Sequence, residues 1–215
     1  MPTRLLITMA QGQEFNKLLT LTGPYMMAYA EKCEATYIAI HGNPAAQWSM
    51  ENKFRAWELA KQFDQTLWVD ADCWIKPTCP NIFDFARLAM HNDKPFIDEK
   101  GFGSLDEYNA VMVSQGLQPV GYLPKMLGAG VVLCTKATAD VWKPPANPLP
   151  PTHCAEQCWV QYQARALGCF DLPIEYNTQA WFKGFKELLP KAHIVHLASV
   201  PHRYDAMRNL IQGND

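Results

Sequence analysis

The sequence predicts an α/β fold with a mostly parallel central sheet flanked by helices. Short apolar runs alternate with segments of helical periodicity over about the first 75 residues, which is the pattern of parallel strands joined by helical crossovers. The remainder is less regular and rich in glycine and proline, so we expect a smaller, irregular half there. At 215 residues, the chain is expected to form one domain, 1–215.

The first half contains three predicted strands, each short and apolar and each followed by polar or glycine-containing sequence. These strands are Arg4–Met9, Ala35–Ile40 and Leu67–Val69. Apolar residues recur at helical spacing over Asn16–Lys32, and we expect Gly23-Pro24 to divide this helix into two pieces. A second helix is expected from an N-cap at Ser49 to about Phe63.

The second half is predicted to hold four helices and two further strands. The helices are expected at Asn81–His91, Ser104–Ser114, Cys154–Leu167 and Tyr204–Ile211. The strands are expected at Gly128–Cys134 and Ile194–Leu197. Long loops in compact domains often carry function, so the loop-rich stretches are candidates for one wall of a binding site. These stretches are Lys94–Phe102 and Leu117–Lys125, and Pro144–Pro151 is a stiff linker.

Composition excludes several classes of protein. Hydrophobic residues make up 48% of the chain and charged residues 19%, which is enough apolar material for a core and too little charge for disorder. A net charge of −2 favours neither nucleic acid nor an anionic membrane as a partner. The apolar run near Met1 is too short for a signal peptide or a membrane span, so we expect a soluble, cytoplasmic protein. The seven cysteines form no CxxC pair, which favours reduced thiols over a structural zinc site.

The third strand leads into two aspartates one residue apart, Asp70 and Asp72. In an extended chain, side chains at this spacing leave the same face and converge. Adjacent carboxylates repel, and a divalent cation such as Mg²⁺ or Mn²⁺ relieves that repulsion and can hold a diphosphate. The alternative is a pair of solvated aspartates in a turn.

Parallel strands place ligands at their carboxyl ends, where two other loops are also expected. These loops are Met9-Ala10-Gln11 and His41-Gly42-Asn43. A nucleotide is the natural ligand for such an edge, but Gly12 stands alone, so no NAD-type glycine fingerprint is present.

The segment Asn52-Lys53-Phe54-Arg55, followed by Leu67-Trp68-Val69-Asp70-Ala71-Asp72, resembles metal-dependent glycosyltransferases of the GT-A fold. The nearest groups are the glycogenin and lipopolysaccharide galactosyltransferase family and the related xylosyl- and galactosyltransferases. The resemblance is patchy but covers nearly the whole chain in order. It implies a nucleotide-binding half at 1–75 and a sugar and acceptor half at 76–215.

The resemblance also implies a role for each residue that matches the family's motifs. The implied ligands of Mn²⁺, or alternatively Mg²⁺, are Asp70, Asp72 and His196. Implied donor-binding residues are Met9, Ala10, Gln11, Lys53, Arg55, Ala71, Gly128, Ala129 and Gly130. Residues implied to act at the sugar are Glu156, Gln157 and Asn177.

Two positions depart from the family's pattern. Gly128 stands where asparagine is common, which removes one expected hydrogen bond to the sugar. The family often continues its histidine with glycine three residues on and lysine six on, whereas this chain has Ser199 and His202, with Arg203 next. The implied diphosphate clamp is therefore His202 or Arg203.

Together these features predict Mn²⁺-dependent transfer of a sugar from a nucleoside diphosphate donor, first of all UDP, to a glycan, protein or small-molecule acceptor. Retention of anomeric configuration is expected, since inversion needs a base. Candidate bases for inversion are Asp98, Asp106 and Glu156. The rival functions are an aspartate-based phosphohydrolase, a nucleotidyltransferase and an inactive sugar-binding homologue.

Overall fold

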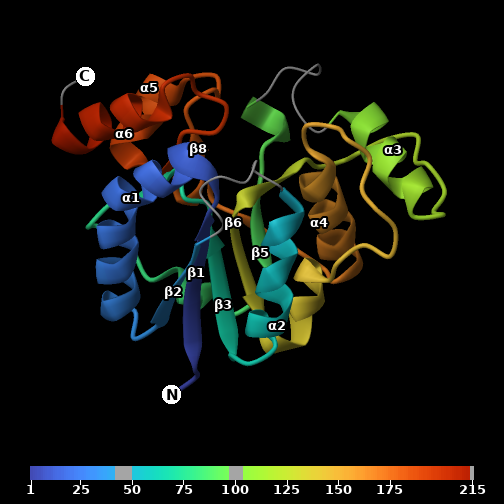
Figure 1. The fold of residues 1–215 in the computed structure, drawn as a ribbon, viewed down its shortest axis with the longest axis horizontal. Coiled ribbons are helices and arrows are strands. Elements are labelled where there is room, and N and C mark those ends of the chain that lie inside the picture. Colours follow the sequence, from blue (N-terminus) through green and yellow to red (C-terminus); the bar gives the residue numbers. More distant parts are fainter. Residues whose placement is uncertain (42–49, 97–103, 214–215) are drawn as a thin grey trace.

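The chain folds around a six-stranded sheet, shown in the computed structural model of Figure 1. The structure describes residues 1–41, 50–96 and 104–213. The strand order is β2-β1-β3-β6-β5-β7. The strands of this sheet are β1 Arg4–Ala10, β2 Thr36–His41, β3 Gln65–Val69, β5 Ala89–Asn92, β6 Leu127–Thr135 and β7 Phe170–Leu172. Only β6 runs antiparallel to its neighbours in this sheet, so the predicted mostly parallel α/β class is confirmed.

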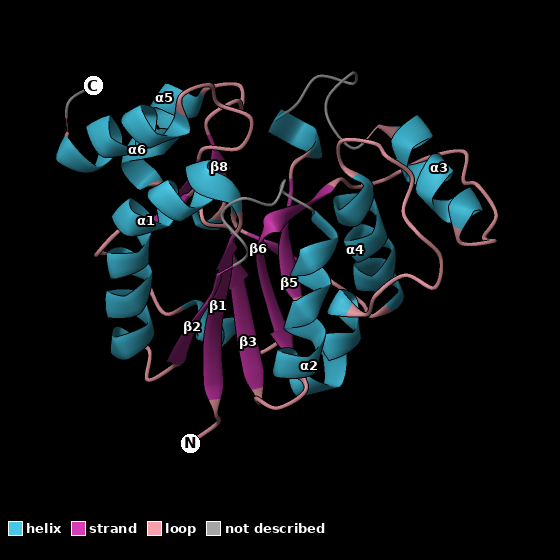
Figure 2. Ribbon diagram, in the orientation of Figure 1, coloured by secondary structure: helices cyan, strands magenta, loops and turns pink. Residues whose placement is uncertain are grey.

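Helices cover both faces of this sheet (Figure 2). The longer helices are α1 Gly12–Lys32, α3 Leu105–Ser114, α4 Ala155–Ala166 and α6 Arg203–Gln212, and the short ones are α2 Ala56–Ala60 and α5 Phe185–Leu188. Successive side chains of β3 point to opposite faces, so Trp68 packs with α2 and α4 while Leu67 and Val69 pack with α1. Burial on both faces explains why β3 reads as a continuous apolar run.

A second, three-stranded sheet joins the segment that follows β3 to the C-terminal part of the chain. Its order is β4-β9-β8, with β4 at Cys73–Ile75, β8 at Thr178–Gln179 and β9 at Ile194–His196. Met207 of α6 and Val195 of β9 pack with Leu18 of α1 in a separate apolar cluster. This cluster holds the C-terminal part of the chain against the N-terminal part, beside the turn that carries the two aspartates.

The predicted break of the first helix at Gly23-Pro24 is wrong, because α1 continues through Pro24. Buried residues lie on both sides of the proline, including Leu18 and Met26. Thr22 Oγ1 donates to Ala71 O at 2.8 Å. Packing along the whole helix therefore outweighs the loss of one backbone hydrogen bond at proline.

The second predicted helix is shorter than expected. A 3-10 helix spans Met50–Arg55 and α2 follows at Ala56–Ala60, so the helix ends before Phe63. The proposed cap, Ser49, lies outside the described residues.

The predicted helix over Asn81–His91 is also wrong. A 3-10 helix at Ile82–Phe85 ends at Ala86, whose φ of 49° is left-handed, and β5 follows. Strand β5 lies between β6 and β7, and its buried residues complete the sheet. The other predicted strands and helices are present, with ends that differ by one or two residues. No helix within the described ranges has the length and apolar character needed to cross a membrane.

Candidate active site

A cavity of about 210 Å³ opens at the carboxyl ends of the parallel strands. Its walls come from the turn after β3, the start of β6, the start of α4 and the end of β9. Predicted site residues that line it are Lys53, Asp70, Ala71, Asp72, Gly128, Ala129, Gly130, Glu156, Gln157, His196 and Arg203. The sheet edge at which a ligand was expected is therefore hollow, and eleven of the seventeen predicted site residues lie in its wall.

The two aspartates converge through a turn and not through an extended strand, which corrects the geometry expected from their spacing. Asp70 N donates to Gly130 O at 2.8 Å, which ends the β3–β6 pairing. Cys73 N then donates to Asp70 O at 3.0 Å and closes the turn. The side chain of Asp72 is 6% exposed, whereas that of Asp70 is 17% exposed.

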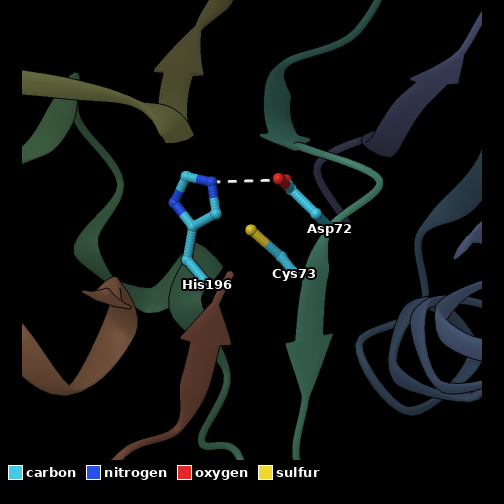
Figure 3. Close-up of side chains that lie close together, drawn as sticks. All are labelled: Asp72, Cys73 and His196. Atoms are coloured by element: carbon cyan, nitrogen blue, oxygen red, sulfur yellow. Dashed lines mark ion pairs between the residues drawn. The ribbon is translucent and has the colours of Figure 1, made fainter. Parts of the chain in front are cut away.

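The imidazole of His196 lies directly against this turn (Figure 3). Its Nε2 is 3.3 Å from Asp72 Oδ1 and 4.0 Å from Asp70 Oδ2. Its Nδ1 lies 3.0 Å from Asn177 Oδ1, an oxygen that can only accept, so Nδ1 carries a proton and donates. This hydrogen bond fixes the ring and turns Nε2 toward the carboxylates, as partners of metal-binding histidines do.

The fold brings together Asp70, Asp72 and His196, the three residues that the resemblance implies as metal ligands. The ring nitrogen Nε2 lies within 4.0 Å of one oxygen of each carboxylate. Carboxylate and imidazole donors suit Mn²⁺, and these three residues would hold it.

Two basic side chains neutralise these carboxylates, Lys53 at the Asp70 oxygen that faces His196 and Arg203 at the second oxygen of Asp72. Lys53 Nζ lies 2.9 Å from Asp70 Oδ2 and 3.4 Å from Glu156 Oε1. Arg203 Nη1 lies 3.3 Å from Asp72 Oδ2. Burial alone would lower the pKa of Lys53, but the Asp70 and Glu156 carboxylates raise it. The cavity therefore holds fixed positive charge on both sides of the acidic turn.

Gly130 is required by the position of His196. A Cβ added at Gly130 would lie 2.2 Å from Cε1 and 2.6 Å from Nδ1 of the imidazole. We predict that Gly130→Ala displaces the ring and lowers the free energy of unfolding by about 1–3 kcal/mol. The melting temperature should fall by roughly 2–4 °C per kcal/mol, and Mn²⁺ affinity should fall with it.

Gly121→Ala is the control for this substitution, because an added Cβ there has nothing within 4 Å. Differential scanning fluorimetry of both variants, with and without Mn²⁺, makes the comparison. If Gly130→Ala melts and binds Mn²⁺ like Gly121→Ala, the close packing of the imidazole on Gly130 is wrong.

The charge on His196 predicts how the stability of the metal-free protein depends on pH. Burial lowers the pKa of His196, but Asp72 and Asp70 raise it more, so the net shift is upward from 6.5. A group with a raised folded-state pKa contributes its full stability below its unfolded pKa, and loses that contribution as pH rises through the folded pKa. We therefore expect the unfolding free energy to fall from about pH 6.5 upward.

Urea unfolding of the wild type and His196→Gln between about pH 6 and pH 9 measures this contribution as a difference. His193→Gln is the control, because burial lowers the pKa of His193 and its contribution has the opposite sign. Parallel stability curves for the wild type and His196→Gln would contradict the raised pKa.

The far end of the cavity contains residues that sequence reasoning missed. Asp93 is 3% exposed, accepts from Gln179 Nε2 at 3.0 Å through Oδ2, and lies 2.8 Å from His91 Nδ1 through Oδ1. Trp181 Nε1 donates to Gln179 Oε1 at 2.7 Å. Burial raises the pKa of Asp93. Asp93, Gln179 and Trp181 line the cavity, and nothing in the local sequence around them signals this position.

Gly128 makes room for this group. A Cβ at Gly128 would lie 2.7 Å from Asp93 Oδ2 and 3.0 Å from Asn177 Nδ2. The resemblance leads one to expect an asparagine at position 128. The side chains of Asp93 and Asn177 occupy the space that this asparagine would need.

Six predicted site residues are absent from the cavity wall. Met9 and Ala10 are core residues, Gln11 accepts from Asn52 Nδ2 at 2.5 Å, and Asn177 lies behind His196. Arg55 is exposed and lines a separate hollow beside Pro144. His202 is exposed with a left-handed φ of 52° and immediately precedes α6. Of the candidate bases, Asp106 is exposed and Asp98 lies outside the described residues.

Comparison with solved structures places this arrangement among known folds. A glycosyltransferase involved in glycosylation of the major capsid of PBCV-1 superposes with a TM-score of 0.65 at 17% identity, over 96% of this chain and 99% of that one. The galactosyltransferase LgtC, solved with donor and acceptor sugar analogs, gives 0.54 at 11% identity over 97% and 95%. This chain has the fold of these enzymes. The bifunctional glycosyltransferase WbbM also matches, at 0.59 and 10% identity, over 98% of this chain and 50% of that one.

No protein-family model matches the sequence, and no curated protein is similar to it in sequence. The superpositions establish the fold, whereas sequence identities of 17% and below do not establish the activity.

Proposed function

We propose that this chain is a glycosyltransferase that moves a sugar from a nucleoside diphosphate donor, first of all a UDP-sugar, to an acceptor hydroxyl in the presence of Mn²⁺. The observation that carries the proposal is the position of His196 Nε2, 3.3 Å from Asp72 and 4.0 Å from Asp70. The histidine lies 124 positions after Asp72 in the sequence, and the fold of the neighbours favours the same reaction class.

Asp70, Asp72 and His196 would hold the ion, which when bound supplies Lewis-acid stabilisation of a departing diphosphate. Lys53 and Arg203 would bind the phosphate oxygens. Arg203, not His202, is the proposed clamp because its guanidinium reaches Asp72 and lines the cavity. On donor binding, each basic side chain would exchange a carboxylate oxygen for a phosphate oxygen.

The sugar would lie between the acidic turn and Asp93. Glu156 Oε2 and Asn177 Nδ2 are buried and have no hydrogen-bond partner among the described residues. A sugar hydroxyl can donate to Glu156 Oε2 in the cavity wall, whereas Asn177 lies behind His196 and would act on the sugar by holding that imidazole. Gln157 lines the same wall and can orient the ring.

Retention of anomeric configuration is the proposed outcome. Oε1 of Glu156 is paired with Lys53 and Oε2 is the proposed acceptor from a donor-sugar hydroxyl, while both oxygens of Asp93 have partners, so neither carboxylate is placed to remove an acceptor proton. Proton NMR of the product anomer decides this point.

A phosphohydrolase with Asp70 as nucleophile is less consistent with the site. Asp70 accepts from Lys53 Nζ at 2.9 Å through Oδ2 and from Trp68 Nε1 at 2.7 Å through Oδ1. Hydrogen bonds at both oxygens lower the nucleophilicity of the carboxylate.

Thermal-shift measurements test the proposal. The protein is heated with UDP, GDP, ADP or dTDP, each with and without Mn²⁺, and with Mn²⁺ alone. We expect a joint rise in melting temperature for UDP with Mn²⁺, because each ligand completes the site of the other. A panel in which no nucleoside diphosphate stabilises the protein in the presence of Mn²⁺ would contradict the proposed function.

A further inference from the structure

A sulfur atom lies beside the proposed ion site. The ligand atoms of Asp72, Cys73 and His196 all lie within 4.8 Å of one another, and the three residues are 4%, 0% and 5% exposed. Figure 3 shows the thiol of Cys73 pointing into the gap between the imidazole and the Asp72 carboxylate. Six other cysteines, all within the described ranges, belong to no such group there.

The pairing of β4 with β9 creates this cluster. Cys73 is directly opposite His196 in the antiparallel register, and paired residues project their side chains on the same face of a sheet. Leu197 N donates to Asp72 O at 3.0 Å and holds the next position of the chain in place. The pairing of β4 with β9 therefore fixes the position of the Cys73 side chain relative to that of His196.

The orientation of each partner leaves one donor atom for an ion. Asp72 turns Oδ2 to Arg203 and Oδ1 to the imidazole. His196 uses Nδ1 for Asn177 and keeps Nε2 toward the carboxylate. The Cys73 thiol has a long contact of 3.9 Å to Gly130 O, which a sulfur leaves easily.

We propose that Asp72, Cys73 and His196 form a second donor set that takes a thiophilic divalent ion such as Zn²⁺ or Co²⁺. Zn²⁺ would bind this thiolate, imidazole and carboxylate with a water molecule as the fourth ligand of a tetrahedral site, in which neighbouring ligand atoms are roughly 3.3–3.7 Å apart. The Asp72 Oδ1 to His196 Nε2 distance of 3.3 Å already matches. On binding, the metal–sulfur bond forms and the thiol proton leaves to solvent.

The two donor sets share Asp72 and His196, so they exclude each other. Binding of Zn²⁺ at the sulfur site needs no nucleotide and does not depend on the proposed function. Only the expected competition between Zn²⁺ and Mn²⁺ rests on the proposed function. Zn²⁺ would therefore bind without UDP and would prevent the joint stabilisation by UDP and Mn²⁺.

Absorption spectroscopy with Co²⁺ tests the sulfur donor directly. The wild-type chain, reduced and free of metal, is titrated with Co²⁺ in the absence of nucleotide. One equivalent is expected to give a thiolate-to-cobalt charge-transfer band and the intense visible bands of tetrahedral Co²⁺, and Zn²⁺ should remove both.

Cys73→Ser should lose the charge-transfer band and bind Zn²⁺ at least about tenfold more weakly, since even loss of a residue that only orients a ligand has effects of this size. Cys79→Ser is the matched control, because Cys79 is also fully buried and lies outside the cluster. A band that is absent from the wild type, or that persists in Cys73→Ser, would overturn the proposal.

Zinc-edge X-ray absorption of the wild type needs no variant and guards against a Cys73→Ser protein that does not fold. One sulfur at about 2.3 Å with nitrogen and oxygen neighbours is expected, and a shell without sulfur would refute the site. If UDP fails to stabilise the protein while the cobalt band appears, the transferase proposal fails and the sulfur site stands.

Discussion

Replacing Asp72 with asparagine abolishes the thermal stabilisation that UDP and Mn²⁺ are expected to give together, and lowers sugar transfer by at least about 100-fold. The charge of Asp72 is the reason, since Oδ1 faces His196 Nε2 at 3.3 Å and an amide binds a divalent ion poorly. Loss of ion stabilisation costs several kcal/mol in the transition state, and about 2.7 kcal/mol already corresponds to 100-fold.

Asp171→Asn is the control for this charge change. Asp171 forms an exposed pair with Lys125 at 2.6 Å and lies outside the cavity wall. The measurements are the melting temperature with UDP and Mn²⁺ together and the rate of UDP release. A joint shift that survives in Asp72→Asn at wild-type size would remove Asp72 from the ion site.

Lys53→Met is expected to lower the free energy of unfolding by about 3–5 kcal/mol, because removal of one partner from a buried ion pair leaves uncompensated charge. Lys53 is 5% exposed and neutralises both Asp70 and Glu156. The melting temperature should fall on the order of 10 °C, and nucleotide binding should weaken in the same variant.

Two further variants separate burial from simple loss of a cation. Lys61→Met removes an exposed lysine paired with Glu58 at 2.7 Å and should cost less than about 1 kcal/mol. Glu156→Gln in the Lys53→Met background should restore part of the stability, since it removes one of the two stranded charges. Equal losses for Lys53→Met and Lys61→Met in chemical denaturation would show that the buried pair contributes little.

The parallel half of the fold could be predicted because its signals are local. The strands around Leu6, Ile38 and Trp68 are short apolar runs, and the helix between the first two has clear periodicity. The β5 segment could not be predicted in this way. Ala89 and Met90 are ordinary helix residues by propensity, and their extended conformation is imposed by strands β6 and β7 on either side.

The same distinction applies to the candidate site. Asp70 and Asp72 carry a signal in one short stretch, and the resemblance places Glu156 and His196 in order behind them. Asp93 carries no such signal, because the Gly128 backbone and the Gln179 side chain that place it lie 35 and 86 positions away. In the sequence Cys73 is one of seven cysteines without a distinguishing motif, and its position opposite His196 follows only from the β4–β9 register.

The acidic turn is the point where the main sheet continues into the small one, since β3 ends at Val69 and β4 begins at Cys73. An ion bound there would link the end of β3 to β9, which belongs to the other sheet. Amide protons of the small sheet should then exchange with solvent more slowly when the cavity is filled, although they lie beneath the ligand and do not touch it. A filled cavity would therefore make the C-terminal third of the chain more rigid.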